Sequence, residues 1–143
     1  GGLIDSYHAD DAEVILVTMG SVIGTIKDAI DAMRSVGKRV GLIKVRSYRP
    51  FPISALRKAL KDASVIAVIE KDVSIGAEAG IVTDLKAAFY NSSIRVPIIC
   101  FTAGLGGRDI TIKDIRKIVE KAEAARKGIK SEFEFLNLRE EIL

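Results

Sequence analysis

The stretch "CFTAGLGGRDIT" is the part of the sequence that most suggests a binding site. Glycine-rich loops can cradle phosphates, but this one lacks the spacing and the Lys–Ser/Thr pair of a P-loop. Glycines this dense favour positive φ or the close approach of another backbone. A tight turn between a strand and a helix therefore competes with a ligand loop. The residues in question are Gly104, Gly106, Gly107, Arg108 and Asp109.

Two earlier loops carry further candidates. "TMGSVIG" holds Ser21 in a glycine-containing turn whose spacing departs from the dinucleotide fingerprint, so a plain turn is favoured over an anion site. "RSYRPFP" places Tyr48, Arg49 and Phe51 in a loop stiffened by prolines, which is typical of a protein-contact surface. Phe51 packing beneath the next helix is the competing interpretation. The carboxylates of "EKDVSIGAEAG" are more simply explained as solvated helix caps.

Cysteine and histidine usage excludes several kinds of site. The sequence has one cysteine, Cys100, inside the apolar run "VPIICF", and one histidine, His8. One thiol can form neither an internal disulfide nor a cysteine-cluster metal site, and one imidazole makes no histidine zinc site. We expect Cys100 to be buried and inert. The sequence therefore offers no complete catalytic triad, metal cluster or cofactor fingerprint.

Composition indicates a single α/β domain. The chain has 143 residues, of which 48% are hydrophobic and only 6% aromatic, so aliphatic side chains must fill the core. Its 22 basic and 19 acidic residues are interleaved, and the net charge of +3 favours a mixed solvated surface over a nucleic-acid surface. We expect no membrane span and no signal peptide, and a cytoplasmic location.

Apolar runs alternate with amphipathic runs along the chain. Buried strands are predicted near residues 13–20, 40–45 and 64–72, and a fourth strand with its exit loop in 95–107. Helices are predicted near 21–37, 53–63, 78–90 and 111–128. Ile53, Leu56 and Leu60 are expected to face inward from the second helix. Thr111, followed three residues later by Asp114, predicts an N-terminal cap close to a capping box.

This alternation predicts a mostly parallel sheet with right-handed crossovers. The four loops above then leave the carboxyl ends of its strands, where open α/β sheets meet ligands and partners. "LIDSYH" predicts an edge strand that need not be parallel. The tail "SEFEFLNLREEIL" is expected to dock on this domain or on a neighbour.

The motifs "VTMGS", "GKRVGLIKVRSYRPFP", "VIEKD" and "TAGLGGRDIT" occur in this order and spacing, and over roughly residues 3–126 they resemble the alpha subunit of pyruvate:ferredoxin oxidoreductase. Related 2-oxoacid:ferredoxin oxidoreductases share the pattern. The resemblance implies a transketolase C-terminal-like fold, a three-layer α/β/α sandwich on a five-stranded, mostly parallel sheet with one antiparallel edge strand. It further implies one domain over 1–143, with a core of about 3–127 and a tail of 128–143, excised from the C-terminal part of a longer subunit.

The resemblance also implies a division of labour. The complete enzymes use thiamine diphosphate, magnesium and iron–sulfur clusters to convert pyruvate and CoA to acetyl-CoA and CO2, reducing ferredoxin. Those cofactors lie in other modules, so we expect this chain to bind none of them and to be inactive alone. Its expected partners are the N-terminal domain of the same subunit and the other subunits, with ferredoxin a partner of the whole complex. No nucleic-acid or membrane partner is expected.

Ser21, Tyr48, Arg49, Phe51, Gly104, Gly106, Gly107, Arg108 and Asp109 are the expected contact surface. Three alternatives remain open at this point. The chain could be a module that binds CoA or another anion, with Arg108 and the glycine-rich loops at helix N-termini. It could be the same domain of another 2-oxoacid:ferredoxin oxidoreductase, or an unrelated small α/β protein that acts alone.

Overall fold

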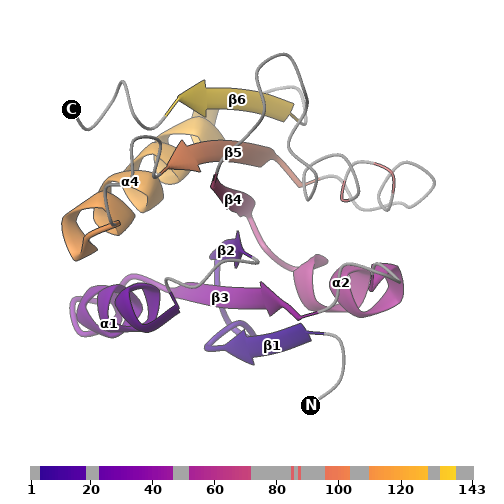
Figure 1. The fold of residues 1–143 in the computed structure, drawn as a ribbon, viewed down its shortest axis with the longest axis horizontal. Helices are drawn as coiled ribbons and strands as arrows, with labels where there is room; N and C mark the ends of the chain where they lie inside the picture. The colour runs from indigo at the N-terminus through magenta and orange to yellow at the C-terminus, as the bar shows by residue number, and fades with distance from the viewer. Residues whose placement is uncertain are drawn as a thin grey trace.

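The computed structural model describes residues 4–18, 23–46, 52–71, 85, 87, 96–103, 110–128 and 133–137, and at some of these, including all of 133–137, the backbone alone. Strands and helices alternate along most of the chain (Figure 1). The elements in chain order are β1 (Ile4–Tyr7), β2 (Val14–Thr18), α1 (Ile23–Arg34), β3 (Val40–Val45), α2 (Ile53–Leu60), β4 (Val65–Lys71), β5 (Ile98–Ala103), α4 (Ile112–Gly128) and β6 (Phe133–Asn137).

The strands form one mixed sheet in the order β1-β3-β2-β4-β5-β6. All neighbouring pairs are parallel except β1 and β3, which run antiparallel with Ile4 opposite Val45 and Tyr7 opposite Leu42. The predicted α/β class, the mostly parallel sheet and the antiparallel edge strand from "LIDSYH" are confirmed.

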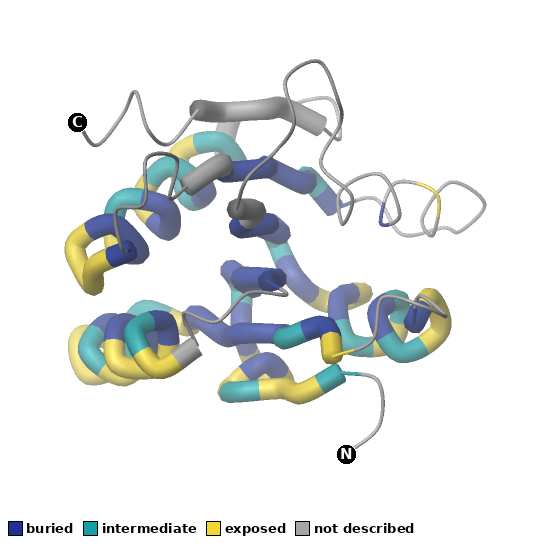
Figure 2. Tube along the Cα trace, in the orientation of Figure 1, coloured by how far each residue is buried: buried dark blue, intermediate teal, exposed yellow. Residues whose placement is uncertain are grey.

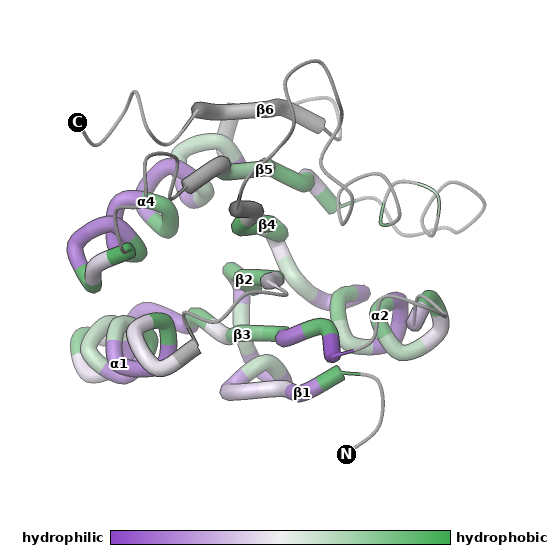
Figure 3. The backbone as a smooth tube through the Cα atoms, viewed as in Figure 1, coloured by the Kyte–Doolittle hydropathy of each residue, from purple (hydrophilic) through white to green (hydrophobic). Residues whose placement is uncertain are grey.

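Helices cover both faces of this sheet, which makes three layers. α1 and α4 lie against one face and α2 against the other (Figure 1). Of the predicted helix near 78–90, the structure describes Leu85 and Ala87, both helical, and Leu85 is buried with α2 on the second face. Figure 2 shows that the buried residues follow the strands and the inward sides of the helices, and Figure 3 shows the same division in hydropathy.

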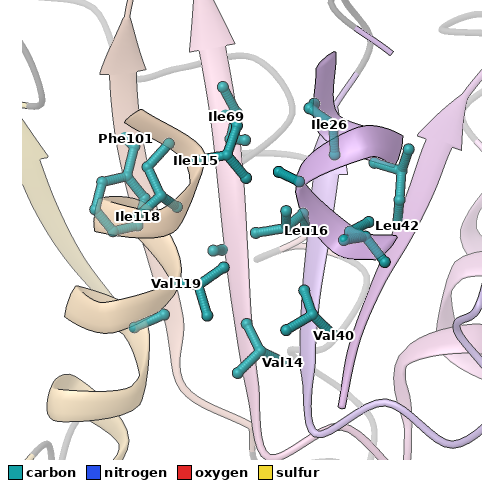
Figure 4. Packing of buried hydrophobic residues seen from close by; sticks show 14 of the residues in the cluster. Val14, Leu16, Ile26, Val40, Leu42, Ile69, Phe101, Ile115, Ile118 and Val119 are labelled. Atoms are coloured by element: carbon teal, nitrogen blue, oxygen red, sulfur yellow. The ribbon is translucent and has the colours of Figure 1, made fainter. Parts of the chain in front are cut away.

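Aliphatic side chains fill the interior, as the scarcity of aromatic residues predicts. On the α1/α4 face, Leu16 and Leu42 from the sheet meet Ile26 from α1, while Phe101 meets Ile118 from α4 (Figure 4). Cys100 is 2% exposed and lies on the opposite face, in the core beneath α2. Its predicted burial is therefore confirmed.

Local signals set the ends of two helices. Gly37 has φ of +89°, and α1 closes with hydrogen bonds from Gly37 N–H to Arg34 O (3.0 Å) and from Lys38 N–H to Met33 O (3.1 Å). This pair of bonds is a Schellman motif, which needs a residue such as glycine at the left-handed position. At the start of α4, Thr111 and Asp114 form the predicted reciprocal cap.

The structure also departs from the expectations. The sheet has six strands rather than five, because residues 133–137 of the tail add β6 in parallel to β5. The tail alternates phenylalanine with glutamate at Phe133–Phe135, which is the period of a strand, whereas only a docking segment is expected there from the sequence. Ile53, expected to face inward, is 40% exposed because it is the first residue of α2, before that helix crosses the sheet.

Candidate docking edge of the sheet

The four candidate loops leave the sheet at one edge. β2 ends at Thr18, β3 at Val45, β4 at Lys71 and β5 at Ala103. The register pairs Thr18 with Ile69, two residues before the end of β4, and pairs Lys71 with Ala103, so these parallel strands end within two residues of one another. The sequence prediction that the loops share the carboxyl edge of the sheet is therefore correct for the strand ends.

The predicted contact residues themselves lie outside the described residues. Their structural context comes from the described positions beside them, which are Thr18, Arg46, Pro52, Ala103 and Ile110. Which of the predicted residues approach one another stays a prediction. The set comprises Ser21, Tyr48, Arg49, Phe51, Gly104, Gly106, Gly107, Arg108 and Asp109.

The order of the strands creates a switch point within this edge. After β2 the chain crosses by α1 to β3 on one side, whereas after β4 it proceeds to β5 on the other side. Adjacent strands whose connections diverge leave a crevice at their carboxyl ends, where open α/β sheets bind ligands and partners. Thr18 lies at this point and is 2% exposed, so its side chain is buried within the domain rather than open to solvent.

The start of α4 bears on whether the glycine-rich loop could hold an anion. Asp114 Oδ2 accepts a hydrogen bond from the backbone N–H of Thr111 (2.9 Å), and Thr111 Oγ1 accepts one from the N–H of Asp114 (3.1 Å). Two N–H groups of this region are thus already bonded, and a carboxylate already lies at the positive end of the helix dipole. The arrangement favours a helix that is capped by its own side chains over a phosphate cradle.

Arg46 begins the proline-containing loop and is held at the side of the sheet. Its Nε lies 3.5 Å from Oδ2 of Asp5 in β1, and both side chains are about half exposed. This ion pair joins the start of the loop to the antiparallel edge strand. An exposed pair of this kind contributes little stability.

A second polar cluster, which the sequence did not predict, lies at the opposite edge. Arg34 donates from Nε to Val40 O (2.9 Å), from Nη2 to His8 O (2.7 Å) and from both Nη atoms to the Asp11 carboxylate. The hydrogen bond from Arg34 holds the pKa of Asp11 below its ordinary value. This cluster fixes the connection between β1 and β2 against α1 and β3.

Tyr7 and His8 lie beside that cluster. Tyr7 donates its hydroxyl to Asp31 Oδ1 (2.6 Å), and this bond is the main reason that the pKa of Tyr7 is raised. Lys27 Nζ lies 5.1 Å from the centre of the Tyr7 ring, and the His8 ring meets it edge-on. No sequence signal linked Tyr7 to Lys27 and Asp31, because these contacts join β1 to α1 across twenty or more positions.

The described part of the chain contains no group of three or more His, Cys, Asp and Glu side chains able to hold a metal ion. None of its helices is long and apolar enough to cross a membrane. What the described residues offer is a sheet whose parallel strands end together at one edge, rather than an assembled set of reacting groups.

Comparison with known proteins identifies relatives over the whole chain. A family model described as pyruvate:ferredoxin oxidoreductase core domain II matches residues 12–115. The chain is 46% identical to pyruvate synthase subunit PorA of Methanosarcina barkeri, with 100% of this chain and 36% of that protein aligned. It is 43% identical to PorA of Pyrococcus abyssi, over 98% of this chain and 36% of that protein. It is 41% identical to ketoisovalerate oxidoreductase subunit VorA of Pyrococcus furiosus, over 82% of this chain and 30% of that protein.

A solved structure shares the fold. 2-Oxoglutarate:ferredoxin oxidoreductase from Magnetococcus marinus superimposes with a TM-score of 0.61 at 17% identity, covering 83% of this chain and 19% of that one. At this identity the likeness concerns the fold alone. The chain spans about a third of the length of the PorA relatives, so most of each relative has no counterpart in the 143 residues.

Proposed function

The chain belongs to the pyruvate:ferredoxin oxidoreductase family, and from this premise we propose that it is a structural, interdomain domain of a thiamine-diphosphate-dependent pyruvate:ferredoxin oxidoreductase. The whole enzyme would convert pyruvate and CoA to acetyl-CoA and CO2 and reduce ferredoxin. The alignment of the entire chain with about a third of PorA carries this proposal. The chain is then one domain of a longer subunit, and its contribution is to hold other modules in place.

The residues of this chain fit poorly with the cofactors of such an enzyme. An iron–sulfur cluster is held by several thiolates, whereas the sequence has Cys100 alone, and that side chain is 2% exposed within the core. We therefore place the clusters on other domains and subunits, and our proposal places thiamine diphosphate and magnesium there as well. When bound there, they supply the chemistry of decarboxylation and electron transfer, while this chain orients the modules that hold them.

The carboxyl edge is the surface that we assign to this role. Four connections leave it side by side, and two of them carry arginine together with aromatic or glycine-rich segments, the composition that central interface contacts favour. The proposed partners are the rest of the same subunit and the other subunits, with ferredoxin a partner of the complete enzyme. Arg49, Phe51 and Arg108 are the proposed anchors of this interface.

Pyruvate is the proposed substrate of the whole enzyme. The family model is described by that substrate, and the PorA relatives are named as subunits of pyruvate synthase. VorA of Pyrococcus furiosus, named for ketoisovalerate, is nevertheless similar at 41% identity. Comparing the rates of the complete enzyme with pyruvate and with 2-ketoisovalerate decides between them, and a preference for the branched substrate would contradict the pyruvate assignment.

Binding of CoA or another anion is the second candidate function. It has support because the Magnetococcus marinus enzyme that shares this fold was solved with coenzyme A bound. Against it, Asp114 already occupies the start of α4, where an incoming phosphate would meet a carboxylate. Calorimetry of the purified chain with CoA tests this function. Micromolar affinity that disappears in Arg108→Ala would establish it, and no heat at millimolar CoA would exclude it.

Assembly of the complete enzyme tests the structural role. Arg49→Ala and Arg108→Ala should each weaken the association of this subunit with its partners by about 10- to 100-fold, the range for a central interface arginine. Arg39→Ala is a matched control, because Arg39 is an exposed arginine at the other edge of the sheet, paired with Glu13. Native mass spectrometry at increasing dilution reports the dissociation. Dissociation equal to that of the unmodified enzyme in both loop variants would contradict the assignment.

A further inference from the structure

An open cavity of about 350 Å³ lies on the α2 face of the sheet, between that helix and the connection from β1 to β2. It is bounded by α2 on one side and by residues 8–13, which connect β1 to β2, on the other. Small and aliphatic side chains make its inner surface, namely Ile4, Ala9, Ala12, Ile15, Ala55 and Ala59. The cavity exists because alanines stand where larger side chains would fill the space between the helix and the edge of the sheet.

The wall formed by residues 8–13 is held in place by contacts with β3 and with Arg34 of α1. A Cβ at Gly41 would lie 2.5 Å from His8 O and 2.8 Å from Ala9 Cα, so glycine at this position lets the connection lie directly on β3. Arg34 then binds His8 O and the Asp11 carboxylate. The wall is thus formed before any partner arrives, which lowers the entropy lost on binding.

Charged groups line the same cavity. Asp10 projects from the β1–β2 connection, Asp62 follows the end of α2, and Lys58 lies on the last turn of that helix. Within the described part of the chain, none of these three side chains takes part in an ion pair or side-chain hydrogen bond. The cavity thus carries a net charge of −1 on a chain whose overall net charge is +3.

We propose that this cavity receives an arginine side chain from the rest of the oxidoreductase, a contact that rests on the proposed structural role of the domain. The methylene stem of an arginine can lie against the alanine surface while its guanidinium pairs with Asp10 or Asp62. The occupant comes from outside this chain, since the chain spans about a third of its relatives' length. The contact would be a second attachment point, on a different face from the carboxyl edge.

The shape and charge of the cavity favour this occupant over others. Two carboxylates and one ammonium disfavour an anionic ligand, and a wholly apolar side chain would leave both carboxylates desolvated without a partner. A second copy of this chain could also supply an exposed arginine at the contact. The experiment must therefore distinguish self-association from binding to the rest of the oxidoreductase.

Accessibility of a cysteine placed in the cavity tests its occupancy. Ala59→Cys puts a thiol on the wall, and the native Cys100 is buried, so peptide mass spectrometry of maleimide labelling reports the new thiol. We expect labelling in the assembled enzyme to be at least about tenfold slower than in the separated chain, because an interface core excludes solvent. Val36→Cys is the control, since Val36 is 70% exposed and lies outside the cavity. Equal labelling of Ala59→Cys in both states would overturn the proposal.

Neutralising the carboxylates tests the charge of the occupant. Asp10→Asn combined with Asp62→Asn should return the labelling of Ala59→Cys in the assembled enzyme toward the rate of the separated chain, by about tenfold, because an interfacial arginine would lose its partners. Asp28→Asn, an exposed carboxylate on α1, is the matched control. Protection that persists in the double variant would refute a cationic occupant. Protection that appears in the separated chain at high concentration would indicate self-association and would refute an occupant from the rest of the oxidoreductase.

These results are separable from those for the proposed function. If Arg49→Ala and Arg108→Ala weaken assembly while the cavity stays accessible, the structural role stands and the second attachment point is refuted. If those variants assemble normally while the cavity becomes protected, the cavity contact stands and the assignment of the carboxyl edge is refuted.

Discussion

Arg34 holds together three segments at the amino ends of the parallel strands, where the sequence predicted no site. It reaches two backbone carbonyls and one carboxylate from the last turn of α1, and its side chain is 20% exposed. Its partners are His8 and Asp11 in the β1–β2 connection, which are more than twenty positions away, and Val40, which belongs to β3. Sequence spacing describes neighbours on one helix or strand, so it could not predict this contact.

Gly41 is the residue on which the close approach of this connection depends. Gly41→Ala should lower the free energy of unfolding by about 1–3 kcal/mol, because the new methyl group would overlap His8 O and Ala9 Cα. Gly24→Ala is the control. Apart from its chain neighbours and the backbone of its own helix, nothing lies within 4 Å of a Cβ at Gly24, in the first turn of α1, so alanine there should be neutral or slightly stabilising. Urea unfolding measures both, and equal effects of the two substitutions would contradict the packing described.

Asp11 gives a pH-dependent prediction at the same scale. Arg34 lowers the pKa of Asp11 in the folded chain, so the ion pair stabilises the fold above the unfolded pKa near 3.8, and this stabilisation is lost as the pH falls through the lower folded value. Asp11→Asn should therefore destabilise the chain at pH 7 and have a smaller effect at pH 3. Urea unfolding at the two pH values measures the difference. A penalty of the same size at both would show that the carboxylate charge is not involved.

The elements follow sequence signals closely wherever those signals are local. The boundaries of β3 agree with the prediction, α1 closes at Gly37, and α4 begins with the Thr111–Asp114 pair. β6 was missed because its alternation is short and comes after a long charged helix. Ile53 was misplaced because helical periodicity gives the face of a helix but not where that face first meets the sheet.

The cap of α4 is the element-scale feature most open to test. Thr111→Ala removes the hydroxyl that accepts the N–H of Asp114 and should lower the free energy of unfolding by about 1 kcal/mol. Thr25→Ala removes a β-branched residue from the first turn of α1 and should be neutral or slightly stabilising. Thermal unfolding of the two variants compares them. An unchanged melting temperature in Thr111→Ala would mean that the cap contributes nothing.

At the scale of the whole molecule, the sequence was sufficient for the class of fold, the family and the edge at which the loops gather. Strand–helix alternation determines a parallel sheet, and parallel strands place their carboxyl ends together. The open cavity beside α2 was beyond sequence reasoning, because it arises where alanines from α2 and the β1–β2 connection meet in space. The conformations of the contact residues in the loops are likewise not determined by the periodicity of the elements that they join.

A non-catalytic domain of a larger oxidoreductase should not turn over substrate when purified, and turnover by the purified chain is therefore the most direct test. The chain would be supplied with pyruvate, CoA, thiamine diphosphate, Mg²⁺ and oxidised ferredoxin, beside the complete enzyme under the same conditions. We predict acetyl-CoA formation by the complete enzyme and none by the chain above the rate without protein. Acetyl-CoA formation that rises in proportion to the concentration of the purified chain would contradict the structural role proposed for it.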